Sequence, residues 1–278
     1  MKYLIINADD FGYNSEQNEA ILDLAQKGLI TSTSVLAVGP KAAECEKLNN
    51  IDISVGVHLA INSDCQENRW QSLTKAQSLG GKTGLPTKQS DLTFKAKRKD
   101  VLAELFAQYE FVSSRVPVDH ADNHCGTLYG INGRRFYLDA YSLCEKFSLP
   151  YRFPKTDGFL TRQMGREMPK PVLAFQQMIV KKGEEKGVNL LDDLISNPWN
   201  IERIGTYENL RDYYINQVKN LKDGVTEIFL HPAKPLSDEK TEWTKRVFEY
   251  KLLKSGDLLE CAEKTGVQVV SWKIFDII

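Results

Sequence analysis

The chain has 278 residues, of which 42% are apolar and 26% are charged, a composition typical of a folded protein with a large core. Its 36 Lys and Arg residues nearly balance its 37 Asp and Glu residues, which argues against a dedicated nucleic-acid binder. No apolar run approaches the roughly 18 residues that a membrane helix needs. We therefore expect neither a nucleic-acid partner nor a membrane partner.

Short β-type segments alternate with longer helical segments along the chain. Residues 3–7 (YLIIN) form an apolar run that is typical of a strand buried on both faces and not of a signal peptide. A helix follows, capped by Asn14 or Ser15 and ended by Gly28. Further strands are predicted at residues 32–38, 53–59, 116–121, 151–153, 226–230 and 267–272, and further helices at 92–112, 134–147, 210–221, 237–254 and 255–264.

This alternation predicts an α/β fold with a mostly parallel sheet of about seven strands covered by helices. Periodicity alone leaves open whether the sheet closes into a barrel or stays open and doubly wound. Residues 61–91 and 154–199 interrupt the rhythm, and we expect them to be loop excursions over the active face of a single domain spanning residues 1–278.

The five cysteines are odd in number, widely spaced and without a CxxC pair. This usage predicts a reduced, cytoplasmic protein in which most cysteines are buried small hydrophobic residues. Only Cys125 lies in a polar cluster of the sequence.

The four histidines are the most informative residues. His58, His120, His124 and His231 all fall at or just beyond the carboxyl end of a predicted strand. In parallel α/β folds this edge of the sheet carries the functional sites, because the loops converge there. The sequence therefore predicts that a site of this kind lies at the carboxyl edge.

Two adjacent carboxylates, Asp9 and Asp10, follow the first strand directly. A turn at the end of a strand can direct both side chains at one cavity, so that one binds a metal ion while the other accepts a proton. The alternative is an ordinary solvated turn, where Asp is common.

His120, Asp122 and His124 alternate along one segment, and alternate residues of an extended chain point to the same side. The segment suits a metal ligand supported by a carboxylate, although a hydrogen-bonded polar loop is the alternative. One carboxylate and two imidazoles would leave open positions for water or substrate, which is the catalytic pattern for a divalent ion. Such a set predicts metal-assisted hydrolysis.

Five segments in order along the chain carry a family resemblance: NADDFG at 7–12, TSTS at 31–34, GVHL at 56–59, HADNH at 120–124 and HP at 231–232. Together they resemble the YdjC-like carbohydrate deacetylases, which include chitooligosaccharide deacetylase. The resemblance implies a distorted parallel (β/α) barrel, often dimeric. It also implies removal of an acetyl group from N-acetylated amino sugars or short oligosaccharides with a divalent metal ion, Mg²⁺ or Zn²⁺. We accordingly expect a small carbohydrate as substrate and a homodimer.

Carried over by position, the resemblance implies that Asp10, His58 and His124 bind the metal. It also implies that Asp9 is the catalytic base and that His231 is an acid for the leaving amine. Many family members have further histidines after the second His of the HxDxH segment, whereas here Cys125, Gly126 and Thr127 follow. This departure leaves the surroundings of the metal and the preferred sugar open.

Residues with supporting roles are expected around this set: His120 and Asp122 behind the ligands, and Tyr13, Trp70, Tyr129 and Arg152 as substrate contacts. Two alternative functions remain. A barrel metal phosphoesterase would need more ligands, often a second metal ion, and basic contacts to phosphate. A non-catalytic sugar-binding protein with a degenerate site would have a ligand-poor cavity at the predicted metal position.

Overall fold

A computed structural model describes residues 1–64, 66–237 and 242–277. In these ranges the strands are β1 (Lys2–Phe11), β2 (Ser32–Val35), β3 (Ser54–Leu59), β4 (His120–Asn123), β5 (Tyr151–Pro154), β6 (Leu190–Leu191), β7 (Asp193–Ile195), β8 (Gly224–Leu230) and β9 (Gln268–Val269). They form one sheet of order β6-β5-β4-β3-β2-β1-β8-β7, with β9 beside β1 and every pair parallel.

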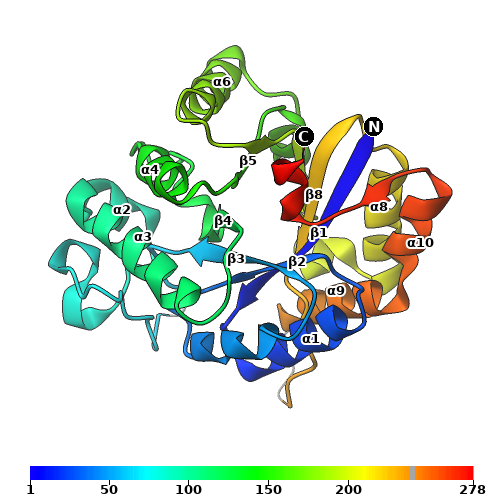
Figure 1. Cartoon of the computed structure of the whole chain (residues 1–278), viewed down its shortest axis with the longest axis horizontal. Helices are drawn as coiled ribbons and strands as arrows, with labels where there is room; N and C mark the ends of the chain where they lie inside the picture. The colour runs from blue at the N-terminus through cyan, green and yellow to red at the C-terminus, as the bar shows by residue number, and fades with distance from the viewer. Residues whose placement is uncertain (65, 238–241, 278) are drawn as a thin grey trace.

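Helices surround this curved sheet (Figure 1). The described α-helices are α1 (Ser15–Gln26), α2 (Gln89–Lys95), α3 (Arg98–Ser113), α4 (Tyr137–Phe147), α5 (Gly158–Met164), α6 (Lys170–Glu184), α7 (Ile201–Ile204), α8 (Tyr207–Lys219), α9 (Trp243–Ser255) and α10 (Asp257–Lys264). Short 3₁₀ turns are η1 (Ala42–Leu48), η2 (Gln77–Leu79), η3 (Gly81–Thr83), η4 (His124–Gly126) and η5 (Trp272–Asp276). The predicted distorted parallel barrel is confirmed.

The barrel is nearly closed by one stretch of chain. β6 pairs with β5, with Leu190 opposite Tyr151, and β7 pairs with β8, with Leu194 opposite Glu227. Only Asp192 separates the two strands. Its carboxylate accepts a hydrogen bond of 2.7 Å from the backbone N–H of Val225. The same stretch therefore joins both ends of the sheet and brings the carboxyl ends of its strands around one opening.

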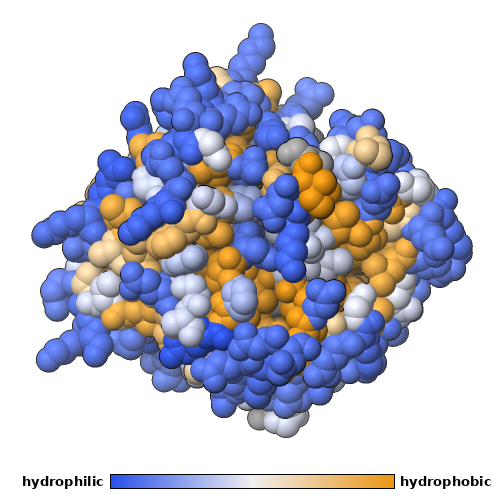
Figure 2. All heavy atoms as spheres, in the orientation of Figure 1, coloured by the Kyte–Doolittle hydropathy of each residue, from blue (hydrophilic) through white to orange (hydrophobic). Residues whose placement is uncertain are grey.

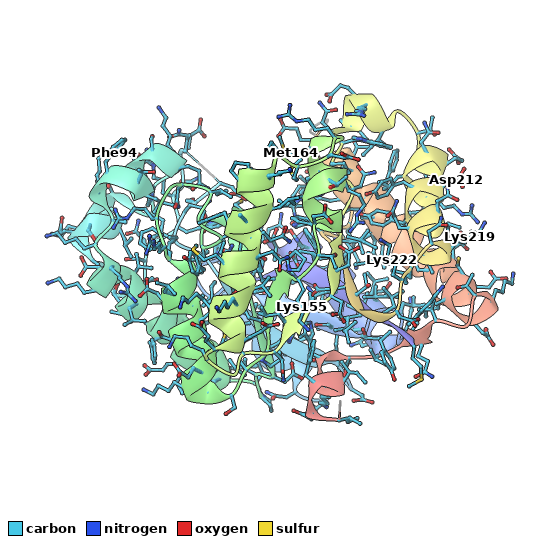
Figure 3. The ribbon with its side chains drawn as sticks, turned by 90° about the horizontal axis from the view of Figure 1, so that it is seen from above. Phe94, Lys155, Met164, Asp212, Lys219 and Lys222 are labelled. Atoms are coloured by element: carbon cyan, nitrogen blue, oxygen red, sulfur yellow. The ribbon has the colours of Figure 1, made fainter. Side chains whose placement is uncertain are left out.

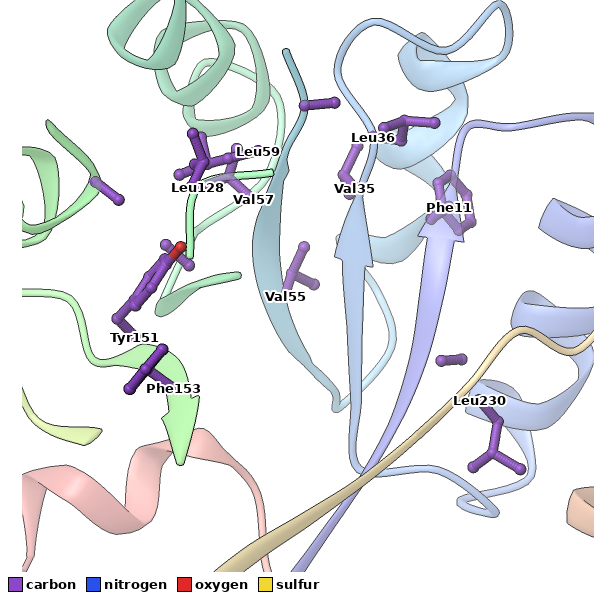
Figure 4. Packing of buried hydrophobic residues seen from close by; sticks show 14 of the residues in the cluster. Phe11, Val35, Leu36, Val55, Val57, Leu59, Leu128, Tyr151, Phe153 and Leu230 are labelled. Carbon is purple, nitrogen blue, oxygen red and sulfur yellow. The ribbon is translucent and has the colours of Figure 1, made fainter. Parts of the chain in front are cut away.

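The two faces of β1 supply two separate apolar clusters. Leu4 and Ile6 belong to the large cluster between the sheet and the helices, whereas Ile5 belongs to a small cluster with Trp272. Figure 4 shows neighbouring strands contributing to the large cluster through Phe11, Val35 and Val57, among others. In the space-filling view apolar residues lie near the centre of the face shown and hydrophilic residues cover the outer helices (Figure 2). The barrel wall is thus apolar on the side of the helices, and part of its other face is apolar around Ile5 and Trp272.

The first helix follows its sequence signals closely. The Asn14 side chain accepts a hydrogen bond of 2.9 Å from the N–H of Gln17, so Asn14 is the cap. The helix ends before Gly28, which has a φ of 66°. Its buried apolar stripe is Ala20, Ile21, Leu24 and Ala25.

Several predicted elements differ from the structure in extent, and two of the differences have a clear cause. The helix predicted at 92–112 is two helices, α2 and α3, because Arg134 donates to the carbonyl of Ala96 and Ser78 accepts from the N–H of Lys97. The strand predicted at 116–121 starts only at His120, since α3 and its final turn continue to Val116.

The second half of the chain departs further from the prediction. Residues 154–199, expected as a loop excursion, contain α5, α6, β6 and β7. The strand predicted at 267–272 is the short β9, and the 3₁₀ turn η5 begins at Trp272. The predicted helix at 237–254 corresponds to α9, and its expected first turn at 238–241 lies outside the described residues. None of the described helices is long and apolar enough to cross a membrane.

Candidate active site

A cleft of about 450 Å³ opens at the carboxyl edge of the barrel. His58 from β3, His124 just after β4 and His231 just after β8 all line it, together with Asp9 and Asp10 from the end of β1. The structure therefore brings these five predicted residues together. The volume lies within the usual range for small-molecule sites.

A bulge at the end of β1 aims two successive side chains into this cleft. The register between β1 and β2 shifts between Ala8 and Phe11, and Asp10 has a φ of 67°. Successive side chains of a regular strand would face opposite sides, so this left-handed residue turns the second carboxylate back to the same side as Asp9. Gln17 holds the bulge by donating to the carbonyl oxygen of Asp9 at 3.0 Å.

Three donor atoms from different strands converge in the cleft. Oδ1 of Asp10 lies 3.3 Å from Nε2 of His58 and 3.2 Å from Nδ1 of His124, and these two nitrogens are 3.3 Å apart. Ligands at about 2.1 Å from a tetrahedral or octahedral ion lie about 3.0–3.4 Å from each other. The three atoms therefore fit one face of a divalent cation and leave its other positions toward the cleft.

Carboxylates behind the imidazoles orient both rings. Oδ1 of Asp122 lies 2.6 Å from Nδ1 of His58, and Oδ1 of Asp64 lies 2.9 Å from Nε2 of His124. Each contact fixes which nitrogen of the ring faces Asp10, as carboxylates behind metal-binding histidines do. Arg246 of α9 lies against the other oxygen of Asp10 at 3.2 Å.

The charges of this group are strongly coupled. Burial alone would raise the pKa of Asp10, but hydrogen bonds from His124 and His58 hold it well below its usual value. Burial alone would lower the pKa of His58, but the charge of Asp122 and hydrogen bonds with Asp10 and Asp122 raise it to about 10. A cation bound here would therefore take the place of protons on the imidazoles.

A second buried cluster lies beside the first. Arg152 of β5 binds both carboxylate oxygens of Asp9 at 2.7 Å, and Asn7 donates to Oδ1 of Asp9 at 2.6 Å. A terminal nitrogen of Arg152 also lies 2.8 Å from Asp122 and 2.5 Å from Glu227. One guanidinium thus connects the carboxylate behind His58 with Asp9. Burial raises the pKa of Glu227 to about 8, against the opposing effect of Arg152.

His231 lies at the opening of the cleft and is the most exposed of the five, with a side-chain exposure of 32%. Its Nε2 atom lies 3.8 Å from Oδ2 of Asp9, and its backbone N–H donates to Glu249 at 2.7 Å. Burial lowers the pKa of His231, against the opposing charges of Asp10 and Asp9.

The other predicted residues take different positions. His120 lies outside the cleft lining: its ring stacks on Trp272 with centroids 4.6 Å apart, and its Nδ1 pairs with Asp119 at 2.7 Å. Tyr129 and Arg152 line the cleft. Trp70 packs behind it against the ring of His124 at 5.3 Å, and Tyr13 lies under Arg246 at 5.1 Å.

Cys125 lies exposed at the opening of the cleft with a φ of 53°. Its sulfur is 3.3 Å from Nε2 of His124 and 3.5 Å from Asp64. Cys45, Cys144 and Cys261 are buried as predicted, and Cys65 lies outside the described residues.

Sequence reasoning missed Asp64, Glu227 and Arg246. Glu227 carried a usable signal, because it is an acid in an otherwise apolar strand, TEIFL. Asp64 lies five residues beyond the end of β3, in a stretch with little patterning, and Arg246 lies on a helix 236 residues from Asp10. Local pattern gives no indication of contacts of this kind.

The chain is similar to several known proteins. The family model described as YdjC-like protein matches residues 3–264. A relative named carbohydrate deacetylase from Geobacillus stearothermophilus is 24% identical, covering 99% of this chain and 98% of the relative. Another of that name from Thermoanaerobacter pseudethanolicus is 23% identical, with 99% of each chain covered. A chitooligosaccharide deacetylase from Proteus mirabilis is 32% identical over 44% of this chain and 48% of its own length.

The fold also matches a solved structure. A crystal structure of an Enterococcus faecalis protein named for cellobiose-phosphate cleavage superposes with a TM-score of 0.76 at 23% identity, covering 99% of this chain and 98% of that one. The family match and the complete ligand set favour neither a phosphoesterase nor a degenerate sugar-binding protein.

Proposed function

This chain belongs to the YdjC-like protein family, and on that premise we propose that it is a metal-dependent hydrolase that removes the acetyl group from N-acetylated amino sugars or short oligosaccharides. The full-length relatives named carbohydrate deacetylase support the reaction. The observation that carries the proposal is the close approach of Asp10, His58 and His124, within 3.2–3.3 Å of one another and next to Asp9.

Asp10, His58 and His124 would hold one divalent cation. When bound, the cation supplies Lewis-acid activation of the acetyl carbonyl and of the attacking water. Two imidazole nitrogens and one carboxylate oxygen suit Zn²⁺, and the open side toward the cleft also suits Mg²⁺ with its water ligands. We therefore propose Mg²⁺ or Zn²⁺.

Asp9 accepts the proton of the attacking water. Its Oδ1 atom accepts hydrogen bonds from Asn7 and Arg152, whereas Oδ2 faces Arg152 and, at 3.8 Å, the imidazole of His231. The bidentate contact with Arg152 holds the carboxylate plane of Asp9 in one orientation at the lining of the cleft. Such positioning is what a general base requires.

His231 completes the proton transfer. Its Nε2 atom takes up a proton from Asp9, which is the nearest acid once it holds the water proton. The imidazolium then donates that proton to the sugar nitrogen as the C–N bond breaks, giving acetate and a free amine. His231 thus acts as the acid only after Asp9 has acted as the base.

The test is acetate release from a panel of chitooligosaccharides, after chelation of resident metal and addition of Zn²⁺, Mg²⁺, Mn²⁺, Co²⁺ or Ni²⁺ singly. We expect acetate to appear only with added metal and to vanish in His58→Ala. Phosphate release from phosphomonoesters, with no acetate from any amide, would refute the proposal in favour of a phosphoesterase.

We also propose that residues 1–278 act as one catalytic domain, in a homodimer in the cytoplasm. The dimer follows from the family resemblance. A reducing compartment agrees with the four cysteines of the described ranges, all of which are free thiols. Light scattering of the purified protein tests the dimer.

A further inference from the structure

A second, smaller cavity adjoins the catalytic cleft. This annex has a volume of about 120 Å³ and lies between the end of β5, α5 and α6. The two cavities share four lining residues, namely Tyr129, Ile131, Phe159 and Leu160. No residue of the metal group, nor Asp9 or His231, lines the annex. It is therefore an extension of the substrate cleft away from the reacting atoms.

The walls of the annex are almost entirely apolar. They include Phe153, Phe159, Leu160, Val172, Phe175 and Ile179. The hydroxyl of Tyr129 is already engaged, since it donates to the carbonyl of Arg152 at 2.6 Å. Half of the eight large hydrophobic side chains that are exposed in the described ranges border the annex or the cleft: Ile131, Met164, Val172 and Phe175.

One buried amide packs behind this apolar lining. Gln176 contributes to the wall of the annex and is only 3% exposed. Its Nε2 atom donates to the carbonyls of Pro154 and Thr156 at 3.0 and 2.6 Å, which fixes the orientation of the amide. Its Oε1 atom has no hydrogen-bond partner within the described part of the chain and is buried. The amide therefore closes the wall without presenting a polar atom to a ligand in the annex.

We propose that the annex is a subsite for a short apolar substituent located on the amino sugar away from its acetyl group. The proposal rests on the proposed deacetylase function and names the substrate class more closely. A water molecule and a methylene each take roughly 30 Å³, so the annex holds about four heavy atoms. The acetyl methyl is one bond from the reacting carbonyl and must stay near the metal group. A substituent on the glycosidic oxygen of the sugar is several bonds away from the reacting carbonyl and can reach the annex.

Three β-glycosides of N-acetylglucosamine form the test, with methyl, butyl and 3-hydroxypropyl groups. Butyl and 3-hydroxypropyl have the same number of heavy atoms and differ only in CH₃ against OH. We expect kcat/KM for acetate release to be about tenfold higher for butyl than for methyl, because each buried methylene favours binding. We expect the 3-hydroxypropyl glycoside to lose most of this gain, because its hydroxyl would find no partner in an apolar cavity.

One pair of variants assigns the effect to the annex. Phe175→Ser should remove the preference for butyl over methyl, whereas Phe94→Ser should not, because Phe94 lies on α2, apart from Met164 and α5 (Figure 3).

The outcomes separate the subsite from the function it rests on. Acetate from the methyl glycoside, with equal kcat/KM for all three glycosides, would overturn the subsite and leave the deacetylase intact. No acetate from any glycoside would refute the deacetylase itself. The subsite would also be overturned if, in methyl glycosides, kcat/KM rose with the length of the N-acyl chain, because the annex would then hold the acyl group. A change of oligomeric state in Phe175→Ser, without a change in the preference for butyl over methyl, would also overturn the subsite. The annex would then be an interface between copies of the chain.

Discussion

Arg152 holds both carboxylate oxygens of Asp9 at 2.7 Å, one with each terminal nitrogen, although 143 residues separate the two in the chain. The same guanidinium lies within 2.8 Å of Asp122 and Glu227, so it contacts three buried carboxyl groups at once. Since Asp122 in turn orients His58, Arg152 connects the proposed base with the proposed metal group. This geometry makes Arg152 a positioning residue.

We predict that Arg152→Lys retains metal and loses activity by about one to two orders of magnitude. Lysine keeps the charge but cannot bind both oxygens of Asp9 in a planar fork. The loss should appear in kcat with little change in KM. Arg152→Met should also lower the free energy of unfolding by about 3–5 kcal/mol, because it leaves buried carboxylates unpaired. Full activity in Arg152→Lys would show that the bidentate contact has no catalytic role.

The two adjacent aspartates should respond differently to the same change. Asp9→Asn is nearly isosteric but cannot accept a proton, so we expect it to keep metal and to lose activity by roughly two to four orders of magnitude. Asp10→Asn should lose metal and activity together. Elemental analysis and acetate assays on both variants check this. If Asp9→Asn lost its metal and Asp10→Asn kept it, Asp9 would be the metal ligand and Asp10 the base.

Removal of one imidazole should remove the metal. We expect His58→Ala and His124→Ala each to lower bound divalent metal from about one ion per chain to a small fraction of that. His120→Gln is the matched control and should keep its metal, because His120 packs on Trp272 outside the cleft. Unchanged metal in both alanine variants would contradict the assignment.

Glu227 should make stability depend on pH. Burial raises its pKa to about 8 in the folded chain, above the ordinary value of 4.5. The folded state therefore binds more protons than the unfolded state between these values, and its stability falls as pH rises from about 4.5 through 8. Glu227→Gln mimics the neutral form and should weaken this decline, by an amount on the order of a few kcal/mol. Denaturant unfolding between pH 6 and 9 measures the free energy of unfolding of both proteins. If it changed with pH in the same way in the variant and the parent chain, a neutral Glu227 would be excluded.

Gly12, just after the β1 bulge, should not tolerate a side chain. It has a φ of 108°, and a Cβ atom there would lie 2.8 Å from Cα of Ala42. We expect Gly12→Ala to lower the free energy of unfolding by more than about 2 kcal/mol, through the clash and the backbone strain. Gly28→Ala is the control: its φ is 66° with nothing within 4 Å, so about 1 kcal/mol is expected. Equal losses would show that the contact with Ala42 is unimportant.

Local sequence determined much of this protein. The apolar strand before Asp9 and Asp10, the capped helix at Asn14 and the alternation of a parallel α/β fold all follow from short-range pattern, because periodicity and capping act within a few residues. Periodicity did not decide that the sheet closes into a barrel. The carboxyl-edge position of His58, His124 and His231 follows as well, since every strand of a parallel barrel ends at the same edge.

Tertiary structure alone decided the rest. Alternation along a strand predicts which face of the sheet a side chain takes, but not how far from the carboxyl edge it lies. His120 is expected on the same face as His124, yet it packs on Trp272, away from the cleft. The contacts of Arg246 with Asp10 and of Arg152 with Asp9 join residues 236 and 143 positions apart. No local pattern encodes such contacts, because they arise only when barrel closure brings distant strands and helices to one opening.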